Sequence, residues 1–283
     1  MPFFSVLLPV CNSQSSIHDC LESIACQHFT DFSVLILVNN SFDLSLDICT
    51  TFCISNSRFE VLDLQDSCKS LPDVLNKGIV YLRDKCDYIV RHDADDYMLP
   101  SRLSDTFQAL MCSHVQPLIH SGNAYIADSS RPYFPYGVSI NDYEIKSRLL
   151  LSSPFIHPAI TFKSSIEFLY DTRFVYAQDL KFFIDNLFSG HYSFSSTPYI
   201  QYTPSVSSFY KRAMQLSLHD VAISSLHKKL IPGFPISSSH QLRCHFVTDE
   251  FRIFPPKDIK VLQHMLYRLN HCFFKIYTSS PLV

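Results

Sequence analysis

Apolar segments of two kinds alternate through the first hundred residues. Residues 32–38 form a continuous apolar run, which is typical of a strand buried on both faces inside a parallel sheet. Residues 17–25 instead repeat apolar positions with the period of a helix, and Ser15 or Ser16 is available as its N-cap. Similar patterns predict further strands at 3–10, 59–64 and 88–93, and further helices at 71–82 and after Pro100. Strands separated by helices form right-handed βαβ units, so the pattern predicts an α/β fold with a mostly parallel central sheet flanked by helices.

The second half of the chain mixes strand and helix patterns less regularly. An apolar side formed by Met214, Leu218, Val221 and Leu226 predicts a helix over 209–230. Strands are predicted at 117–126, 155–162 and 192–202, a helix at 177–188, a Pro- and Ser-rich linker at 231–239 and a last helix at 257–277. We therefore expect one folded domain over 1–208, followed by a C-terminal helical extension over 209–283.

Composition and charge exclude several classes of protein. The chain has 47% hydrophobic and 17% charged residues, as a globular protein does. Its formal net charge of −3 argues against nucleic acid as a partner, because sequence-independent binding needs a basic surface. Neither a GxxxxGK[ST] nor a GxGxxG phosphate loop occurs in the chain. We therefore expect no nucleic-acid partner and no glycine-rich phosphate loop.

The 10 cysteines contain no CxxC pair, and Cys49 and Cys53 are the closest two. This spacing excludes a zinc ribbon or a thioredoxin motif. The opening "MPFFSVLLPV" lacks the basic start and the cleavage site of a signal peptide, so we expect a cytoplasmic protein with reduced thiols. The longest aliphatic run, "VLILV", is too short to span a bilayer. A peripheral association with the inner face of the membrane stays open, as does the oligomeric state.

Three aspartates, Asp93, Asp95 and Asp96, crowd the end of the fourth predicted strand. In sheets of this kind ligands bind at the carboxyl ends of the strands, where residues 9–12 and 39–40 are also expected. A hard divalent cation such as Mg²⁺ or Mn²⁺ suits such carboxylates, and it would neutralise a diphosphate leaving group. The alternative is a solvated turn that caps the next helix, and the Asp-x-Asp spacing alone fits both.

Four motifs follow one another along the chain. The first begins at "PVCN" and continues through the second strand to "NNS". The second joins "LNKGI" (75–79) to "YIVRHDADDYMLPSRL" (88–103), and the last two are "FIHPAITFKSSI" (155–166) and "YDTRFVYAQDLKFFIDNL" (170–187). Together they resemble the inverting family-2 glycosyltransferases with the GT-A fold, over residues 3 to 210. The resemblance implies a Rossmann-like domain in which 1–100 form the nucleotide-sugar-binding half and 101–208 the acceptor half.

The same resemblance implies roles for individual residues. Asp93 should contact the ribose or the base of a nucleotide, and Asp95 with Asp93 should hold Mn²⁺ or Mg²⁺ on its diphosphate. Asp96 should face the donor sugar or order the loop, Asn76 should shape the approach of its helix to the donor, and His157 should line the acceptor side. The residues expected around the nucleotide sugar are thus Pro9, Asn12, Asn39, Asn76, Asp93, Asp96 and His157.

Asp179 matches the carboxylate that acts as general base in this family. An inverting transfer needs one carboxylate to take the proton from the acceptor hydroxyl as its oxygen attacks the anomeric carbon. The residues by themselves leave alternatives open. An aspartate in the first turn of a helix is also favoured by the helix dipole, and His157 fits a structural, hydrogen-bonded histidine equally well.

Three departures from the family pattern concern the donor. Asn39 stands where the family has an aspartate that accepts a hydrogen bond from uracil, and an amide can also donate, which leaves the base less determined. Cys11 replaces a common tyrosine. An arginine usual near the end of the domain is missing, with Gln201 or Tyr202 in its place and Lys211 or Arg212 as candidate replacements.

The resemblance therefore implies a metal-assisted, inverting glycosyltransferase. Its donor should be a nucleotide-diphosphate sugar, with UDP as the first choice of carrier. Its acceptor should be the hydroxyl of a glycan, a lipid-linked sugar or a polysaccharide precursor. The alternative is a noncatalytic GT-A-like domain that binds a nucleotide or a glycan, which Asn39 and the missing arginine favour. A nucleotidyltransferase would need a glycine-rich basic loop after the first strand, and "PVCNSQSS" is neither glycine-rich nor basic.

Overall fold

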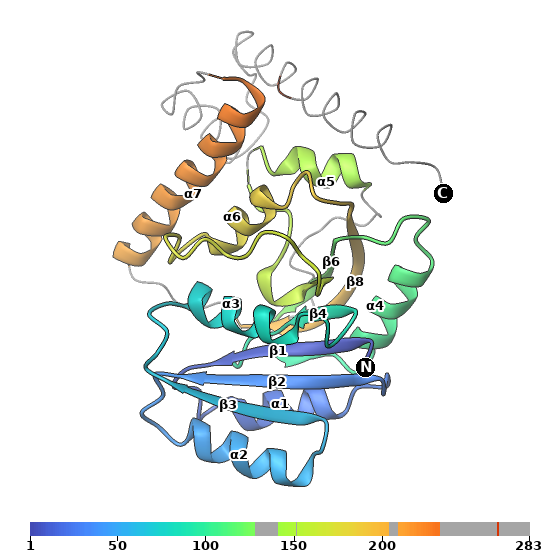
Figure 1. Cartoon of the computed structure of the whole chain (residues 1–283), viewed down its shortest axis with the longest axis vertical. Coiled ribbons are helices and arrows are strands. Elements are labelled where there is room, and N and C mark those ends of the chain that lie inside the picture. The colour runs from blue at the N-terminus through green and yellow to red at the C-terminus, as the bar shows by residue number, and fades with distance from the viewer. Residues whose placement is uncertain (128–140, 151, 204–208, 233–264, 266–283) are drawn as a thin grey trace.

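A single sheet of eight strands runs through the described part of the chain (Figure 1). The computed structural model describes residues 1–127, 141–150, 152–203, 209–232 and 265. The strands are β1 (Phe4–Val10), β2 (Phe32–Asn39), β3 (Phe59–Gln65), β4 (Tyr88–Arg91), β5 (Tyr97–Met98), β6 (Ile119–Ile126), β7 (Ile160–Lys163) and β8 (Tyr192–Tyr202). The helices are α1 (Ile17–Ala25), α2 (Ser45–Ser55), α3 (Leu71–Leu82), α4 (Arg102–Met111), α5 (Asp142–Arg148), the 3-10 helix η1 (His157–Ala159), α6 (Gln178–Asp185) and α7 (Phe209–Leu230).

The strand order β3-β2-β1-β4-β7-β6-β8-β5 joins a parallel half to a mixed half. Strands β3, β2, β1 and β4 pair in parallel, and β4 pairs antiparallel with β7. Helices α1, α2 and α4 pack on one face of the sheet, whereas α3, α6 and α7 pack on the other. Because both faces are covered, every residue of β1 is buried, as the continuous apolar run predicts. The predicted α/β fold with a mostly parallel sheet and a helical C-terminal part is confirmed.

Helix α3 lies unusually close to the strands beneath it. A Cβ at Gly78 would lie 2.3 Å from Leu7 Cδ1 and 2.8 Å from Leu37 Cδ1. A side chain at this position would force the buried Leu7 and Leu37 side chains to shift, so glycine is the residue that fits this packing without rearrangement. The glycine of the "LNKGI" motif therefore holds α3 against β1 and β2, and it has a packing role.

The sequence prediction was wrong about several local elements. The strand predicted at 155–162 begins only at Ile160, and His157–Ala159 form a 3-10 turn that Pro158 favours because it has no N–H to pair in a sheet. Helices α2 and α5 were not predicted. The reason for α2 is a weak apolar pattern, since it buries only Ser45, Cys49 and Phe52.

The C-terminal helix has the predicted bounds, and Leu226 and Leu218 of its predicted apolar side pack into the core as expected. Val221 is 47% exposed, and Ala222, Ile223 and Leu230 also pack into the core. Met265 is fully buried in the same hydrophobic cluster. Apart from Ile231, Pro232 and Met265, the linker and the last helix predicted at 231–239 and 257–277 lie outside the described residues.

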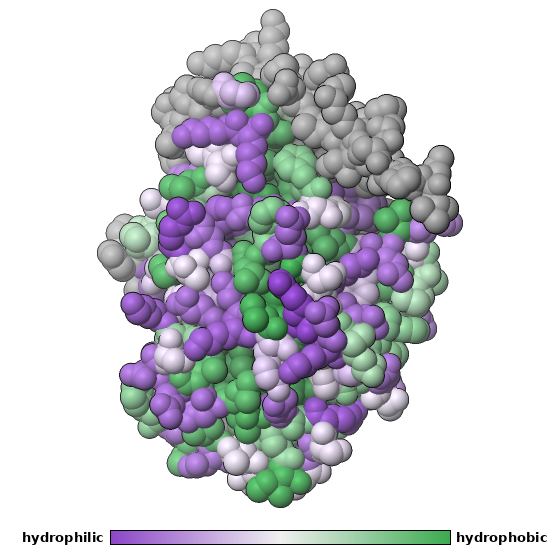
Figure 2. Space-filling view, viewed as in Figure 1, coloured by the Kyte–Doolittle hydropathy of each residue, from purple (hydrophilic) through white to green (hydrophobic). Residues whose placement is uncertain are grey.

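The surface seen in the same view carries polar and apolar side chains interspersed, without one continuous apolar area over the described residues (Figure 2). Within the described ranges, each helix is too short or too polar to cross a membrane.

Candidate active site

Two adjoining cavities open where the parallel strands end. The first, of about 560 Å³, is lined by residues that follow β1, β2, β3 and β4, and we call it the strand-end cavity. The second, of about 720 Å³, is lined by η1, the start of α6 and the first half of α7, and we call it the helix-side cavity. Leu71 and Asp93 line both. All of the expected site residues except Asn76 and Asp96 therefore line one of these two cavities, and Asp93 lines both.

Pro9 and Asn12 line the strand-end cavity, as expected from the carboxyl end of β1. Asn12 has a left-handed backbone (φ 48°), which asparagine tolerates better than most residues. Its Oδ1 accepts a hydrogen bond from Phe42 N–H at 2.9 Å, and its own N–H donates to Ser41 Oγ at 3.1 Å. Asn12 therefore fastens the loop after β1 to the loop after β2.

Asn39 lines the same cavity, but its side-chain amide is hydrogen-bonded to the loop after β3. The pairing of β2 with β3 shifts register between Val38 and Asn39, and such a bulge re-aims the side chain. Asn39 Nδ2 donates to Cys68 O and Asn39 Oδ1 accepts from Cys68 N–H, both at 3.2 Å. Asn39 is thus positioned at the cavity wall, with its amide oriented by the backbone of Cys68.

The loop that carries the aspartates is hydrogen-bonded to Ser16 and Cys20, at the start of α1. Ser16 Oγ donates to Ala94 O at 2.9 Å, and Cys20 Sγ donates to Asp93 O at 3.4 Å. Ser16 is the N-cap position of α1, but its hydroxyl does not cap the helix. The hydroxyl donates to the backbone of the aspartate loop instead.

Asp93, Asp95 and Asp96 present carboxylate oxygens that all lie within 4.8 Å of one another. Desolvation, followed by the charge of Asp93, raises the pKa of Asp96 to about 8 and also raises the pKa of Asp95. Asp96 Oδ1 accepts from Thr203 N–H at 3.0 Å, whereas its buried Oδ2 has no partner within the described ranges. Crowded carboxylates with an unpaired buried oxygen suit a hard divalent cation, so these residues fit Mn²⁺ or Mg²⁺.

A buried arginine balances part of this negative charge. Arg91 Nη1 lies 2.5 Å from Asp93 Oδ2, and the Arg91 side chain is 2% exposed. Burial disfavours the charged guanidinium, but Asp93 outweighs this and keeps the pKa of Arg91 raised. A second buried arginine, Arg102, donates hydrogen bonds to Arg91 O at 2.8 Å and to His92 Nδ1 at 3.1 Å. No role was predicted for Arg102, and these contacts show that it holds the end of β4 in place.

Asp179 lies in the helix-side cavity, in the first turn of α6. The residue before the helix, Ala177, has a left-handed backbone (φ 55°) that turns the chain into α6. Asp179 is half-buried, and in the described part of the chain no group donates a hydrogen bond to its carboxylate. That carboxylate is therefore free to take a proton from a molecule in the cavity.

His157 also lines the helix-side cavity and is not among the residues that line the strand-end cavity. Its Nε2 lies 2.8 Å from Tyr170 Oη. Burial and then the charge of Arg91 lower the pKa of His157 well below its usual value, so the imidazole is neutral. Both its hydrogen bond and its position on the cavity wall are observed.

Asn76 is not among the residues that line the strand-end cavity. Asn76 Nδ2 donates to Tyr170 O and Asn76 Oδ1 accepts from Tyr170 N–H, both at 2.8 Å. Its side chain lines a further hollow, which shares Cys68 and Lys69 with the strand-end cavity. Because both ends of the amide bind the backbone of Tyr170, Asn76 holds this segment in place, and its role toward the donor stays a prediction.

Several residues that line the two cavities were not predicted, apart from Lys211. Lys69, on the loop between β3 and α3, lines the strand-end cavity. Lys211, a proposed replacement for the missing arginine, lines the helix-side cavity together with Gln215 and His219. Their spacing of four residues places all three on one side of α7, and this polar stripe was visible in the sequence. The side chain of Arg212 lies outside the described part.

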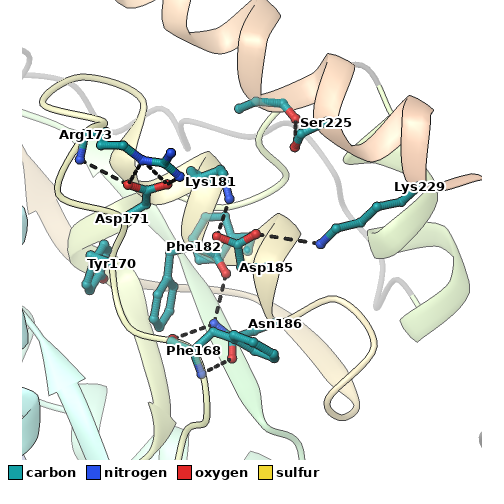
Figure 3. A network of polar contacts seen from close by, with 12 residues as sticks. Phe168, Tyr170, Asp171, Arg173, Lys181, Phe182, Asp185, Asn186, Ser225 and Lys229 are labelled. Atoms are coloured by element: carbon teal, nitrogen blue, oxygen red, sulfur yellow. Dashed lines mark hydrogen bonds and ion pairs between the residues drawn. The ribbon is translucent and has the colours of Figure 1, made fainter. Parts of the chain in front are cut away.

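Helix α7 is attached to α6, the helix that carries Asp179 (Figure 3). Lys229 Nζ of α7 lies 3.7 Å from Asp185 Oδ1 of α6, and Asp185 also pairs with Lys181 one turn earlier. His227 Nε2 lies 2.8 Å from Leu150 O. The second half of α7 is therefore anchored, while its first half lies over the helix-side cavity.

Comparisons with solved structures show the same fold. The structure of S. aureus TarS 1–349 in complex with UDP-GlcNAc has a TM-score of 0.63 and 17% identity, covering 86% of this chain and 71% of that one. Mannosyltransferase PcManGT from Pyrobaculum calidifontis, in complex with GDP-Man and Mn²⁺, has a TM-score of 0.56 and 14% identity, covering 99% of this chain and 76% of the other. These similarities confirm the GT-A fold.

Comparisons of sequence point to one family. The putative glycosyltransferase EpsH of Bacillus subtilis is 27% identical over 139 residues, which is 47% of this chain and 39% of EpsH. The chain thus matches well under half the length of this curated relative. The model of glycosyl transferase family 2 matches residues 5–161, more than half of the chain. The chain therefore belongs to glycosyl transferase family 2, as its motifs predict.

Proposed function

We propose that the chain transfers a sugar, with inversion, from a nucleotide diphosphate to the hydroxyl of a glycan acceptor. The observation that carries this proposal is the position of Asp93. It lines the cavity that Asp95 also lines, and it lines the cavity that contains Asp179. Donor and acceptor bound in the two cavities would meet at this boundary.

The donor belongs in the strand-end cavity. Asp93 and Asp95, with the unpaired Oδ2 of Asp96, would hold Mn²⁺ or Mg²⁺. When bound, the ion neutralises the charge that develops on the leaving diphosphate. Arg91, Ser16 and Cys20 keep the aspartate loop in position for it. UDP is our first choice as carrier, supported by the UDP-GlcNAc complex of TarS, while the GDP-Man complex of PcManGT makes GDP the next one to test.

The acceptor belongs in the helix-side cavity. There Asp179 would take the proton from the acceptor hydroxyl while that oxygen bonds to the anomeric carbon and the bond to the diphosphate breaks. Neutral His157 offers a hydrogen bond without competing for the proton. Hydroxyl and amide groups of Ser152, Gln178 and Gln215 also line the cavity, which suits a hydroxyl-rich molecule. We therefore propose a glycan, a lipid-linked sugar or a polysaccharide precursor as acceptor.

This proposal modifies the division of the chain into halves. The strand-end cavity draws on residues before 100, in agreement with a nucleotide-sugar-binding half over 1–100. The helix-side cavity draws mainly on residues 152–202, with Leu71, Arg91 and Asp93 at its border to the first cavity, and also on Lys211, Gln215 and His219. We propose that the acceptor half extends past residue 208 into α7. A cytoplasmic location, with or without a peripheral contact to the inner face of the membrane, stays a prediction.

Two substitutions test the proposed roles. Asp179→Asn keeps the size of the side chain but removes the base, so transfer should fall about 10²- to 10⁴-fold with UDP binding unchanged. Asp95→Ala should abolish transfer and also remove the Mn²⁺ dependence of UDP binding. Asp19→Ala, at an exposed aspartate of α1, is the matched control. Transfer is measured with UDP-, GDP-, dTDP- and CMP-sugars, and nucleotide binding by calorimetry with and without Mn²⁺.

The outcomes separate the alternatives. Wild-type turnover by Asp179→Asn would exclude Asp179 as the base. Nucleotide binding that depends on Mn²⁺, without transfer or donor hydrolysis for any of these donors, would instead identify the noncatalytic binding domain.

A further inference from the structure

We propose that Lys69 selects the nucleobase of the donor and that Asn39 positions the loop that carries it. The selected bases are those with a carbonyl oxygen facing the lysine, uracil and guanine, over cytosine and adenine. This inference rests on the proposed function, because it assumes that a nucleoside diphosphate occupies the strand-end cavity. It assigns base recognition to a residue that the sequence motifs do not single out.

The strand order places the base near β3. The carboxylate cluster follows β4 and Lys69 follows β3, with β1 and β2 between them. Three strand spacings of about 4.8 Å separate the two ends of the cavity by roughly 14 Å. Both ends line the same cavity. A nucleotide whose phosphates lie at the carboxylates therefore extends toward β2 and β3, and its base reaches the wall formed by Asn39, Cys68 and Lys69.

Asn39 is engaged with the backbone at this wall. Its Oδ1 faces Cys68 N–H and its Nδ2 faces Cys68 O, and Asn39 is 7% exposed. An aspartate could accept from the N–H but could not donate to the carbonyl, so it would place a negative oxygen against Cys68 O. This pairing explains why asparagine occupies the position. Asn39 holds the backbone next to Lys69, which makes it a positioning residue for the loop.

Lys69 is the cation of this cavity. Among the described residues that line it, no other carries a positive charge. The side chain is exposed, and its ammonium has no hydrogen-bond partner within the described ranges. An ammonium has three donors and no acceptor. It can therefore donate to uracil O4 or guanine O6, but it meets an NH₂ donor at the equivalent edge of cytosine or adenine.

Calorimetry with UDP, GDP, CDP and ADP tests this inference on the full chain in the presence of Mn²⁺. The wild-type chain should bind UDP and GDP about tenfold or more tightly than CDP and ADP, because one charge-assisted hydrogen bond is lost with the latter pair. In Lys69→Met this ratio should fall below about threefold, with CDP binding little changed. Lys228→Met, at an exposed lysine of α7 outside both cavities, should keep the wild-type ratio.

Asn39→Asp tests the positioning role. If the loop is held through Cys68 O, this variant should lose discrimination between UDP and CDP as Lys69→Met does, although its own carboxylate could accept a hydrogen bond from uracil. An unchanged ratio of UDP to CDP affinity in Asn39→Asp would exclude the positioning role. A general structural defect would weaken the binding of all four nucleotides equally and would therefore leave this ratio unchanged.

Two results would overturn the assignment of Lys69. Equal binding of all four nucleotides by the wild-type chain would show that the wall does not select a base. Equal weakening of all four in Lys69→Met would show that the lysine acts on the phosphates. Failure of the wild-type chain to bind any of the four would overturn the proposed function itself, and this inference with it.

Discussion

At the scale of single residues, the carboxylate cluster is stabilised by a few contacts from distant segments. Arg91 pairs with Asp93, and Thr203 donates its N–H to Asp96. Arg102 supports the first of these contacts by donating a hydrogen bond to Arg91 O. Each contact leaves at least one carboxylate oxygen exposed to the cavity or unpaired, so the loop is ordered while its capacity to bind a cation is retained.

Cys11 offers a direct test of nucleotide binding in the strand-end cavity. Its thiol is exposed and lines that cavity, where the family has a tyrosine. N-ethylmaleimide should therefore alkylate Cys11, and UDP with Mn²⁺ at about ten times its Kd should slow this labelling about tenfold, because only the unoccupied cavity reacts. Peptide mass spectrometry measures the labelling rate.

Cys26 and Cys112, also exposed but outside both cavities, serve as internal controls whose labelling should not respond to UDP. Unchanged labelling of Cys11 at a UDP concentration that calorimetry shows to be saturating would place the nucleotide elsewhere.

At the scale of elements, α7 is the helix that completes the helix-side cavity. Its first half supplies Lys211, Gln215 and His219, and its second half packs on α6. Residues 5–161 match the family model, so α7 lies beyond the matched region. The wall of the helix-side cavity is therefore partly built from residues that lie beyond the region matched by the family model.

Apolar packing, and not the ion pair, should hold α7 in place. Leu226 is fully buried, so Leu226→Ala should lower the free energy of unfolding by about 2–5 kcal/mol. Lys229 is 45% exposed, so Lys229→Ala should cost at most about 0.5 kcal/mol despite its contact with Asp185. Urea unfolding curves compare the two. A loss of stability in Lys229→Ala as large as that in Leu226→Ala would contradict this view.

At the scale of the whole molecule, β4 joins the parallel half of the sheet to its mixed half. It pairs in parallel with β1 and antiparallel with β7. The aspartates directly after β4 consequently lie between the strand-end cavity on one side and the helix-side cavity on the other. The position of the cluster at the boundary follows from this topology.

Buried histidines should make the whole fold sensitive to acid. Desolvation and then the charge of Arg102 lower the pKa of His120 to about 3, and burial also lowers the pKa values of His92, His157 and His227. These imidazoles are neutral in the folded chain, but the unfolded chain takes up protons below about pH 6.5. Stability is therefore present above pH 6.5 and is lost as the pH falls from there toward 3, by up to about 1.4 kcal/mol per pH unit for each histidine.

His120→Gln isolates one of these contributions. His120 lies within 2.9 Å of Tyr199 Oη and 2.8 Å of Ser193 Oγ, so glutamine removes the titrating ring at a fully packed position. The slope of unfolding free energy against pH should become shallower between pH 6 and 4 by up to about 1.4 kcal/mol per pH unit, whatever the loss of stability at pH 7. His18→Gln, at an exposed position, is the control. Equal slopes in wild type and His120→Gln would show that His120 is protonated in the fold.

The sequence by itself determined the features that depend on neighbouring residues. The alternation of apolar runs with helical patterns predicted β1 to β4, α1 and α3, because each strand or helix buries its own apolar face. The motif around Asp93 and the motif around Asp179 predicted the family, since both consist of residues close together in the chain. Local pattern failed where it is weak, as in α2, or where one proline changes the backbone, as at Pro158.

Only the tertiary structure decided which partners these side chains have. Asn39 and Asn76 were both expected around the nucleotide sugar. Instead, the amide of Asn39 pairs with Cys68, and the amide of Asn76 pairs with Tyr170, which is 94 positions further along the chain. Lys69 and the stripe on α7 carried no motif, and folding brought them to the walls of the two cavities. The physical reason is that a hydrogen-bonding group takes whichever partner packing places within reach. In this protein those partners come from segments that the sequence keeps far apart.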